Sequence, residues 1–205
     1  MEEFIIVRGA GDIASGILYS LHKIGHKVIA LDVANPTAIR RQVAFSSAIS
    51  AKDGTFTIEG VTAEYVGAAE GYIPETVKLK QRISQVWKRN RIPVLVDANA
   101  DIISYLLSEQ LPACESGVDA ETTMLPMVII DAILAKRNLG TDRREFARIY
   151  GEYGLPAPCV IGVGPGFTTG EDVDFVIETM RGHGLGEVIC EGAAFPNTGI
   201  PGDVG

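Results

Sequence analysis

The chain has 205 residues, of which 46% are hydrophobic, so it is long enough to bury the core of a domain and too apolar to be disordered. Its 18 basic and 26 acidic residues give a net charge of −8, which argues against nucleic-acid and anionic-membrane partners, because both require clustered Lys and Arg. The cysteines Cys114, Cys159 and Cys190 are widely spaced, and the N-terminus lacks the pattern of a signal peptide. We therefore expect a cytoplasmic protein without a disulfide framework, and the residue spacings predict no metal site.

The first predicted elements form a βαβ unit. Residues 4–7 (FIIV) are an apolar run typical of a buried strand, and residues 12–23 place apolar side chains at helical spacing. Residues 28–31 (VIAL) form the second strand, which ends at Asp32. Short β-rich pieces then follow within residues 36–74, at 42–45, 55–58 and 62–66.

Helical and apolar segments alternate in the rest of the chain. Predicted helices span residues 74–89, 101–110, 142–153 and 171–180, predicted strands span 93–96, 127–130, 160–163 and 188–190, and residues 112–126 form a loop. Such alternation is typical of a mostly parallel sheet with helices on both faces. We predict one Rossmann-like α/β domain over residues 1–205, with a small β-rich insertion around residues 36–74.

The first candidate site is the turn Gly-Ala-Gly-Asp-Ile-Ala at residues 9–14, which matches G-x-G-x-x-A between a strand and a helix. Gly9 suits the tight turn, Gly11 lets a pyrophosphate approach the helix N-terminus, and Ala14 lets the helix pack closely. Asp32 follows at the spacing of a ribose-binding acid. Asp12 places a carboxylate where a phosphate would lie, so it either caps the helix or holds a metal beside the phosphate. The alternative is a tight turn that binds nothing.

A second glycine-rich loop spans residues 162–170 and again follows a predicted strand. Its backbone N–H groups, from Gly164 to Gly166, and the hydroxyl of Thr168 could cradle an anion. The alternative is a plain connection in which Thr168 or Thr169 caps the next helix.

A third candidate follows the predicted strand 127–130. Asp131 ends this strand, where ligands bind in open α/β sheets. Lys136 and Arg137 form a basic pair in an acidic chain and could contact a phosphate or carboxylate. The alternative is that both are solvated surface charges.

His183 lies in the glycine-rich sequence Arg-Gly-His-Gly at residues 181–184 and is the candidate catalytic residue, as a general base or a ligand. A lone histidine is more often structural, so both interpretations stay open.

Six segments of the chain have distinctive sequences: V-R-G-A-G-D-I-A-S-G (7–16), P-T-A-I-R-R (36–41), D-A-I-L-A-K-R-N-L-G-T (131–141), I-G-V-G-P-G-F-T-T-G-E-D-V-D (161–174), E-T-x-R-G-H (178–183) and P-N-T-G-I-P-G (196–202). Together they resemble one family, the YqeB-type accessory proteins of selenium-dependent molybdenum hydroxylases. The first motif is also similar to the Rossmann domain of XdhC-type molybdenum-enzyme chaperones. Two departures stand out: Met180 replaces the family's Asn, and the chain stops at Gly205 where the family continues into a small β module.

The resemblance implies a cytoplasmic protein that matures, or inserts cofactor into, enzymes related to xanthine dehydrogenase. Our hypothesis is an accessory factor that binds NAD(P), another nucleotide or the molybdenum cofactor at the Gly9–Ala14 turn. Its expected partner is a molybdenum hydroxylase apoenzyme, and a homodimer is the default assembly. The alternatives are an NAD(P)-dependent oxidoreductase with His183 as acid/base, and a scaffold that binds protein without any nucleotide.

Overall fold

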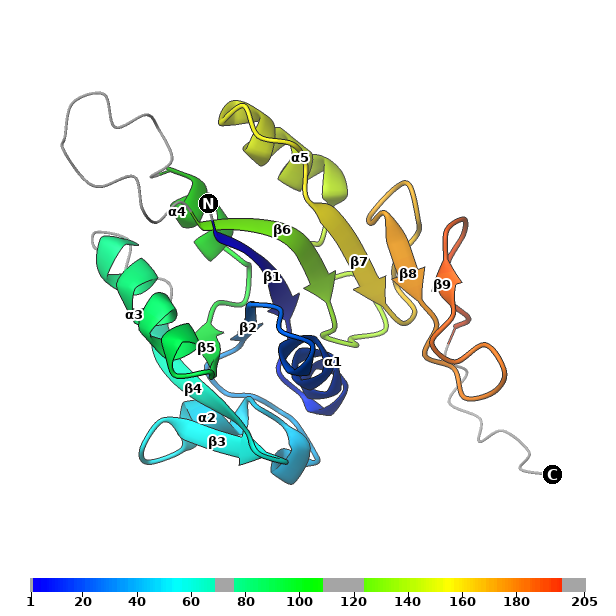
Figure 1. Ribbon diagram of the computed structural model, residues 1–205. Coiled ribbons are helices and arrows are strands. Elements are labelled where there is room, and N and C mark those ends of the chain that lie inside the picture. Colours follow the sequence, from blue (N-terminus) through cyan, green and yellow to red (C-terminus); the bar gives the residue numbers. More distant parts are fainter. Residues whose placement is uncertain (1, 69–75, 109–123, 197–205) are drawn as a thin grey trace.

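A single nine-stranded sheet organises the computed structural model, which describes residues 2–68, 76–108 and 124–196 (Figure 1). The strand order is β3-β4-β5-β2-β1-β6-β7-β8-β9. Neighbouring strands are parallel except in two antiparallel pairs at the edges, β3–β4 and β8–β9. The strands are β1 (Glu2–Arg8), β2 (Val28–Asp32), β3 (Thr55–Ile58), β4 (Val61–Ala68), β5 (Ile92–Val96), β6 (Met124–Asp131), β7 (Cys159–Val163), β8 (Phe175–Ile177) and β9 (Val188–Ile189).

Helices cover both faces of this sheet, which confirms the predicted α/β architecture. Helix α1 (Asp12–Lys23) and the short α2 (Ser47–Ser50) lie on one face; α3 (Thr76–Lys88), α4 (Ile102–Ser108) and α5 (Arg143–Glu152) lie on the other. Each face has its own hydrophobic core. Successive strand residues point to opposite faces, so Ile6 packs in the core under α3 to α5 while Val7 packs under α1.

Local sequence explains where α1 ends and where α5 begins. The buried residues Ala14 and Leu18 of α1 are four apart and face the sheet. After α1 ends, Gly25 adopts a positive φ of 94°, which suits glycine at the end of a helix. Helix α5 begins after Asp142, whose side chain accepts a hydrogen bond from the N–H of Arg144.

The strand predicted at residues 42–45 is wrong. The chain there forms a 3-10 helix, η1 (Arg41–Val43), and then α2. Its backbone bonds to the first helix and turn rather than to a strand, because the N–H of Phe45 donates to Ser15 Oγ and that of Ser46 to the carbonyl of Ala10. Buried Phe45 and Ala48 anchor the segment against α1, and this tertiary packing outweighs local β propensity.

The helix predicted at residues 171–180 is also wrong. Residues 171–174 form a turn, in which Asp172 accepts the N–H of Thr168, and β8 then pairs with β7. Val173 and Val176 are buried at a spacing of three, which a helix would also give, but the exposed Phe175 and buried Val176 alternate as a strand requires. The predicted loop at 112–126 ends in the first residues of β6, Met124–Pro126, and its remainder lies outside the described residues, as do 197–202.

Within the described ranges, no helix combines the length and apolar character needed to cross a membrane.

Candidate functional site

The centre of the sheet contains a topological switch point. From β1 the chain builds one side of the sheet through β2 to β5, and then crosses to β6 on the other side of β1. In open α/β sheets, ligands bind in the crevice outside the carboxyl ends of the strands at such a point. Here the register places Arg8 of β1 beside Leu31 of β2 and Asp131 of β6.

A cavity of about 630 Å³ lies at this point. Its walls come from the β1–α1 turn, the segment after β2, the end of β5 and the loop after β6, at residues 8, 9, 11–14, 31–33, 36–39, 97–99, 132–134 and 139. The volume lies within the range of small-molecule and cofactor sites. The cavity contains the first predicted site. All five of its residues line the cavity: Gly9, Gly11, Asp12, Ala14 and Asp32.

The two glycines of the first turn have different surroundings. Gly9 has a φ of 99°, and a Cβ there would lie 2.9 Å from the carbonyl oxygen of Ala132, so only glycine lets this turn approach the loop after β6. Gly11 has an ordinary φ of −68°, and no atom lies within 4 Å of a Cβ built on it. Gly11 therefore leaves open space beside the N-terminus of α1, on the cavity wall.

Asp12 is the first residue of α1 and is bound within the protein. One carboxylate oxygen accepts the N–H of Ile13 at 2.9 Å, and the other pairs with Arg40 from the segment after β2. Burial opposes ionisation, but the Arg40 guanidinium and the backbone donors outweigh it and lower the pKa of Asp12. In this structure the Asp12 carboxylate thus binds a backbone N–H in the first turn of α1, and Arg40 neutralises its charge.

Asp32 connects the end of β2 to the glycine turn. Its oxygens accept the N–H groups of Ala10 at 2.8 Å and Val33 at 2.7 Å, which fixes the turn relative to β2. Burial raises the pKa of Asp32 above its ordinary value, although both hydrogen bonds favour the charged form. Each carboxylate oxygen has a second lone pair, so the side chain can still accept a hydroxyl from a ligand.

Asp97 is a site residue that the sequence analysis did not select. It follows β5, lines the cavity, and accepts the N–H groups of Asp101 and Ile102 at the start of α4. Burial raises its pKa too. The signal that could have identified it is the same as for Asp32, an aspartate directly after a buried strand.

Arg8 is the second residue that the sequence analysis missed. It is 3% exposed and contacts buried Asp131 and Thr141 through Nη1, at 3.1 Å from Asp131 Oδ2. The Thr141 hydroxyl donates to the same Oδ2 at 2.6 Å, and Arg8 Nη2 donates to the carbonyl of Ala98 at 3.1 Å. Arg8 Nε has no hydrogen-bond partner in the described part of the chain, and such a buried donor costs about 1–3 kcal/mol. A charged residue that ends an apolar strand was the available signal.

Strained backbone conformations occur after β5 and β6, two of the strands whose ends border the cavity. Of the five described residues other than glycine with positive φ, three follow β5 or β6: Ala100 at 62°, Leu134 at 59° and Lys136 at 60°. Such conformations cost of order 1–3 kcal/mol each and tend to occur at functional sites. Leu134 lines the cavity directly.

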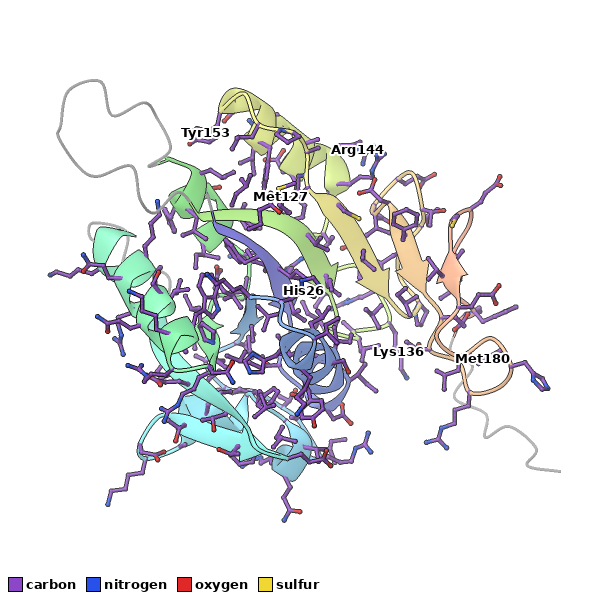
Figure 2. All side chains as sticks on the ribbon, viewed as in Figure 1. His26, Met127, Lys136, Arg144, Tyr153 and Met180 are labelled. Atoms are coloured by element: carbon purple, nitrogen blue, oxygen red, sulfur yellow. The ribbon has the colours of Figure 1, made fainter. Side chains whose placement is uncertain are left out.

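The other predicted residues lie elsewhere. Lys136 and Arg137 have exposed side chains, and neither lines the cavity; Lys136 lies near the carboxyl ends of β6 and β7 (Figure 2). Gly164, Gly166 and Thr168 belong to the loop after β7, outside the cavity walls. His183 is exposed in the connection between β8 and β9, and it does not line the cavity either.

The charges of the cavity are predominantly negative. Arg8 is paired with Asp131, and Asp12 with Arg40, whereas Asp32 and Asp97 accept hydrogen bonds from backbone N–H groups. In the described ranges, no three His, Cys, Asp or Glu side chains gather as a metal site would require. The carboxylates of Asp32 and Asp97 are therefore suited to accepting hydrogen bonds from hydroxyl groups, such as those of a ribose.

The opening of the cavity is apolar. Five of the residues that line it are aliphatic and at least 36% exposed: Ile13, Val33, Ile39, Ile133 and Leu139. Ile39 is 97% exposed. This apolar rim is suited to a planar ring or to another apolar surface.

The fold and the crevice define a Rossmann-like α/β protein with a ligand-type cavity at the switch point of its sheet. The chain is 43% identical over 202 residues to the protein named "Uncharacterized protein YqeB" from Escherichia coli (strain K12). The match covers 98% of this chain and 30% of that relative, and it confirms the resemblance to YqeB-type proteins. No family model and no solved structure matches the chain.

Proposed function

We propose that this protein binds a nucleotide, or a cofactor that contains one, in the cavity at the carboxyl ends of β1, β2 and β5. The observation that carries the proposal is Gly11, whose missing side chain leaves open space at the N-terminus of α1 inside a cavity of suitable size. Its φ is ordinary and no atom lies close to it, so neither backbone strain nor packing requires glycine at this position. A phosphate that approaches the backbone would supply the reason.

The cavity suggests how such a ligand would lie. The phosphates would lie against the Gly9–Gly11 turn, and the ribose hydroxyls would donate to Asp32. The base would contact the apolar rim. Because an acidic residue at this position repels a 2′-phosphate, NAD is favoured over NADP among dinucleotides. The molybdenum cofactor is the other candidate ligand.

The biological role that we propose is maturation of a selenium-dependent molybdenum hydroxylase, with the apoenzyme as partner. Support comes from the sequence segments shared with YqeB-type proteins. The chain spans about 30% of the length of its E. coli relative, so this role concerns the region that the two proteins share. Copurification of the apoenzyme with this chain, with and without nucleotide, tests the role; no capture in either condition would contradict it.

A thermal-shift panel tests the ligand. The protein is melted with NAD, NADP, ATP, CTP and GTP, each with and without magnesium. A ligand at ~100 times its dissociation constant stabilises the folded state by about 2.7 kcal/mol, which is readily measured as a rise in Tm. No shift with any nucleotide would contradict nucleotide binding and favour either a protein-binding scaffold or the molybdenum cofactor as ligand.

Substitution of Gly11 tests whether the ligand binds at the first glycine turn. In Gly11→Val the new side chain occupies the open space, so a shift seen with the wild type should disappear while the protein stays folded. The matched control is Gly16→Ala, which also adds atoms to an open glycine of α1 but outside the cavity walls, and it should keep the shift. An unchanged shift in Gly11→Val would place the ligand elsewhere.

A further inference from the structure

We propose that Arg8 is the anion-binding side chain of the cavity, so the ligand carries a phosphate or carboxylate group that reaches the end of β1. The inference rests on the proposed function only for the location of the ligand. It adds a residue and a ligand chemistry that the glycine turn does not specify.

The position of Arg8 is fixed by three strands. It is the last residue of β1 and the register partner of Asp131 on β6, so both side chains lie on the same face of the sheet. The carbonyl of Ala98, directly beyond β5, accepts a hydrogen bond from Nη2. The guanidinium is therefore held where the carboxyl ends of β1, β5 and β6 meet, and Arg8 lines the cavity there.

The hydrogen bonds of Arg8 leave donors available. A guanidinium has five N–H donors in a fixed planar fork. Nη1 donates to Asp131 and Thr141, and Nη2 donates to Ala98. Within the described residues, Nε has no acceptor at all. The donors that remain, on Nε and Nη2, match two oxygens of one phosphate or carboxylate.

The ion pair with Asp131 can persist while an anion binds. Asp131 also accepts from the Thr141 hydroxyl and from the N–H of Ile133 at 3.1 Å, so its charge is shared among several donors. An incoming oxyanion would use the Nε and Nη2 side of the guanidinium, whereas Asp131 holds Nη1. Asp131 thus orients Arg8 and moderates its charge.

Arg8 is also distinctive for its charge. Among the described residues that line the cavity it is the sole cation, and the others with charge are Asp12, Asp32 and Asp97. An anionic group is therefore directed towards the end of β1 and away from the carboxylates after β2 and β5. The opposite, uncharged part of the ligand would face Asp32 and the apolar rim.

Two variants of the ion pair give the test, because both alter the pair but should change anion binding in opposite directions. Arg8→Lys keeps the charge and loses the fork, so it should weaken binding of inorganic pyrophosphate about tenfold. Asp131→Asn leaves the charge of Arg8 without its partner and should strengthen that binding several-fold. The control is Arg144→Lys on α5 (Figure 2), which alters an exposed ion pair with Asp142 and should leave pyrophosphate binding unchanged.

Isothermal titration with pyrophosphate, ADP and adenosine measures these effects, with melting curves to show that each variant is folded. Arg8→Lys should weaken ADP but leave adenosine unchanged. If Arg8→Lys and Asp131→Asn change the affinity for pyrophosphate in the same direction, the proposal is overturned. It is also overturned if the wild type binds neither pyrophosphate nor ADP at millimolar concentration. If Arg8→Lys does not fold, tighter pyrophosphate binding by Asp131→Asn supports the proposal, and unchanged or weaker binding overturns it.

The same data separate this inference from the proposed function. If both variants change pyrophosphate binding but no nucleoside-containing ligand stabilises the protein, Arg8 is an anion site and the nucleotide proposal is wrong. If the protein binds a nucleotide and neither variant changes its affinity, the nucleotide proposal stands and the proposed role of Arg8 is wrong.

Discussion

The two glycine-rich turns of this protein, after β1 and after β7, look alike in sequence and differ in what surrounds them. In the second loop, a Cβ on Gly162 would lie 2.5 Å from the ring of Phe167, and one on Gly166 would lie 2.7 Å from the backbone of Arg137. In the first turn, Gly11 faces open space in a cavity. Packing within the protein thus accounts for Gly162 and Gly166 of the second loop, whereas it does not account for Gly11.

The role of a glycine in such a motif depends on the atoms that a Cβ at its position would contact. A glycine that packs against its own protein indicates a fold constraint, and one that faces an open cavity indicates space for a ligand. Substitutions that add a single Cβ therefore separate the two kinds, and stability and ligand binding are the two measurements.

The largest effect is expected for Gly166→Ala. Its φ of 115° disfavours any side chain, and three backbone atoms of Arg137 lie within 2.8 Å of the new Cβ. We expect the free energy of unfolding to fall by about 3 kcal/mol or more, measured by urea denaturation. Gly170→Ala is the control, since its φ of 79° is also positive but nothing lies within 4 Å. It should cost only about 1–2 kcal/mol; equal losses would show that the contact with Arg137 is unimportant.

Within the first turn, Gly9 and Gly11 should respond differently. Gly9→Ala combines a φ of 99° with a contact at 2.9 Å to Ala132, and we expect it to cost about 2–3 kcal/mol. Gly11→Ala has neither problem and should cost less than about 1 kcal/mol. Thermal melts of the two variants measure this difference. A strongly destabilised Gly11→Ala would mean that the fold itself requires this glycine, and the case for a ligand would weaken.

A carboxylate supports the region around the second loop. Buried Glu178 accepts the N–H groups of Thr179 and Met180 at 2.7 Å and of Phe195 at 2.8 Å, so it joins the β8 end to the segment after β9. Burial opposes its ionisation, but these three donors outweigh burial and lower its pKa. The first residue of the E-T-x-R-G-H segment thus has a structural role.

Glu178→Gln should destabilise the protein by about 1–3 kcal/mol at neutral pH, because an amide NH₂ would face one of the backbone donors. The folded-state pKa of Glu178 is lowered, so its contribution is present above the ordinary value of 4.5 and is lost as the pH falls through the folded-state pKa. Urea denaturation curves of wild type and variant should therefore differ at pH 7 and converge in acid. A difference that is independent of pH would contradict this account.

The sequence predicted the central fold well because its signals there are local. Apolar runs mark β1, β2, β5 and β7, and Asp32 ends a strand as the fingerprint requires. The edges were mispredicted at residues 42–45 and 171–180, where the backbone bonds to distant partners such as Ser15 or pairs with β7. Arg8 and Asp97 were missed for the same reason, since their importance depends on strands that meet only in the folded sheet.

The smallest expected effect concerns Thr168, which the sequence analysis placed in a second anion cradle. Its N–H already donates to Asp172 at 2.9 Å, it forms an isolated bridge with Ala193, and it does not line the cavity. We expect Thr168→Val to change the dissociation constant of a nucleotide by less than about twofold, well below the tenfold that 1.4 kcal/mol would give. Titration calorimetry of Thr168→Val and Gly11→Val with the same nucleotide compares the two dissociation constants directly. A tenfold loss in Thr168→Val would instead place an anion at the second loop and remove the distinction between the two turns.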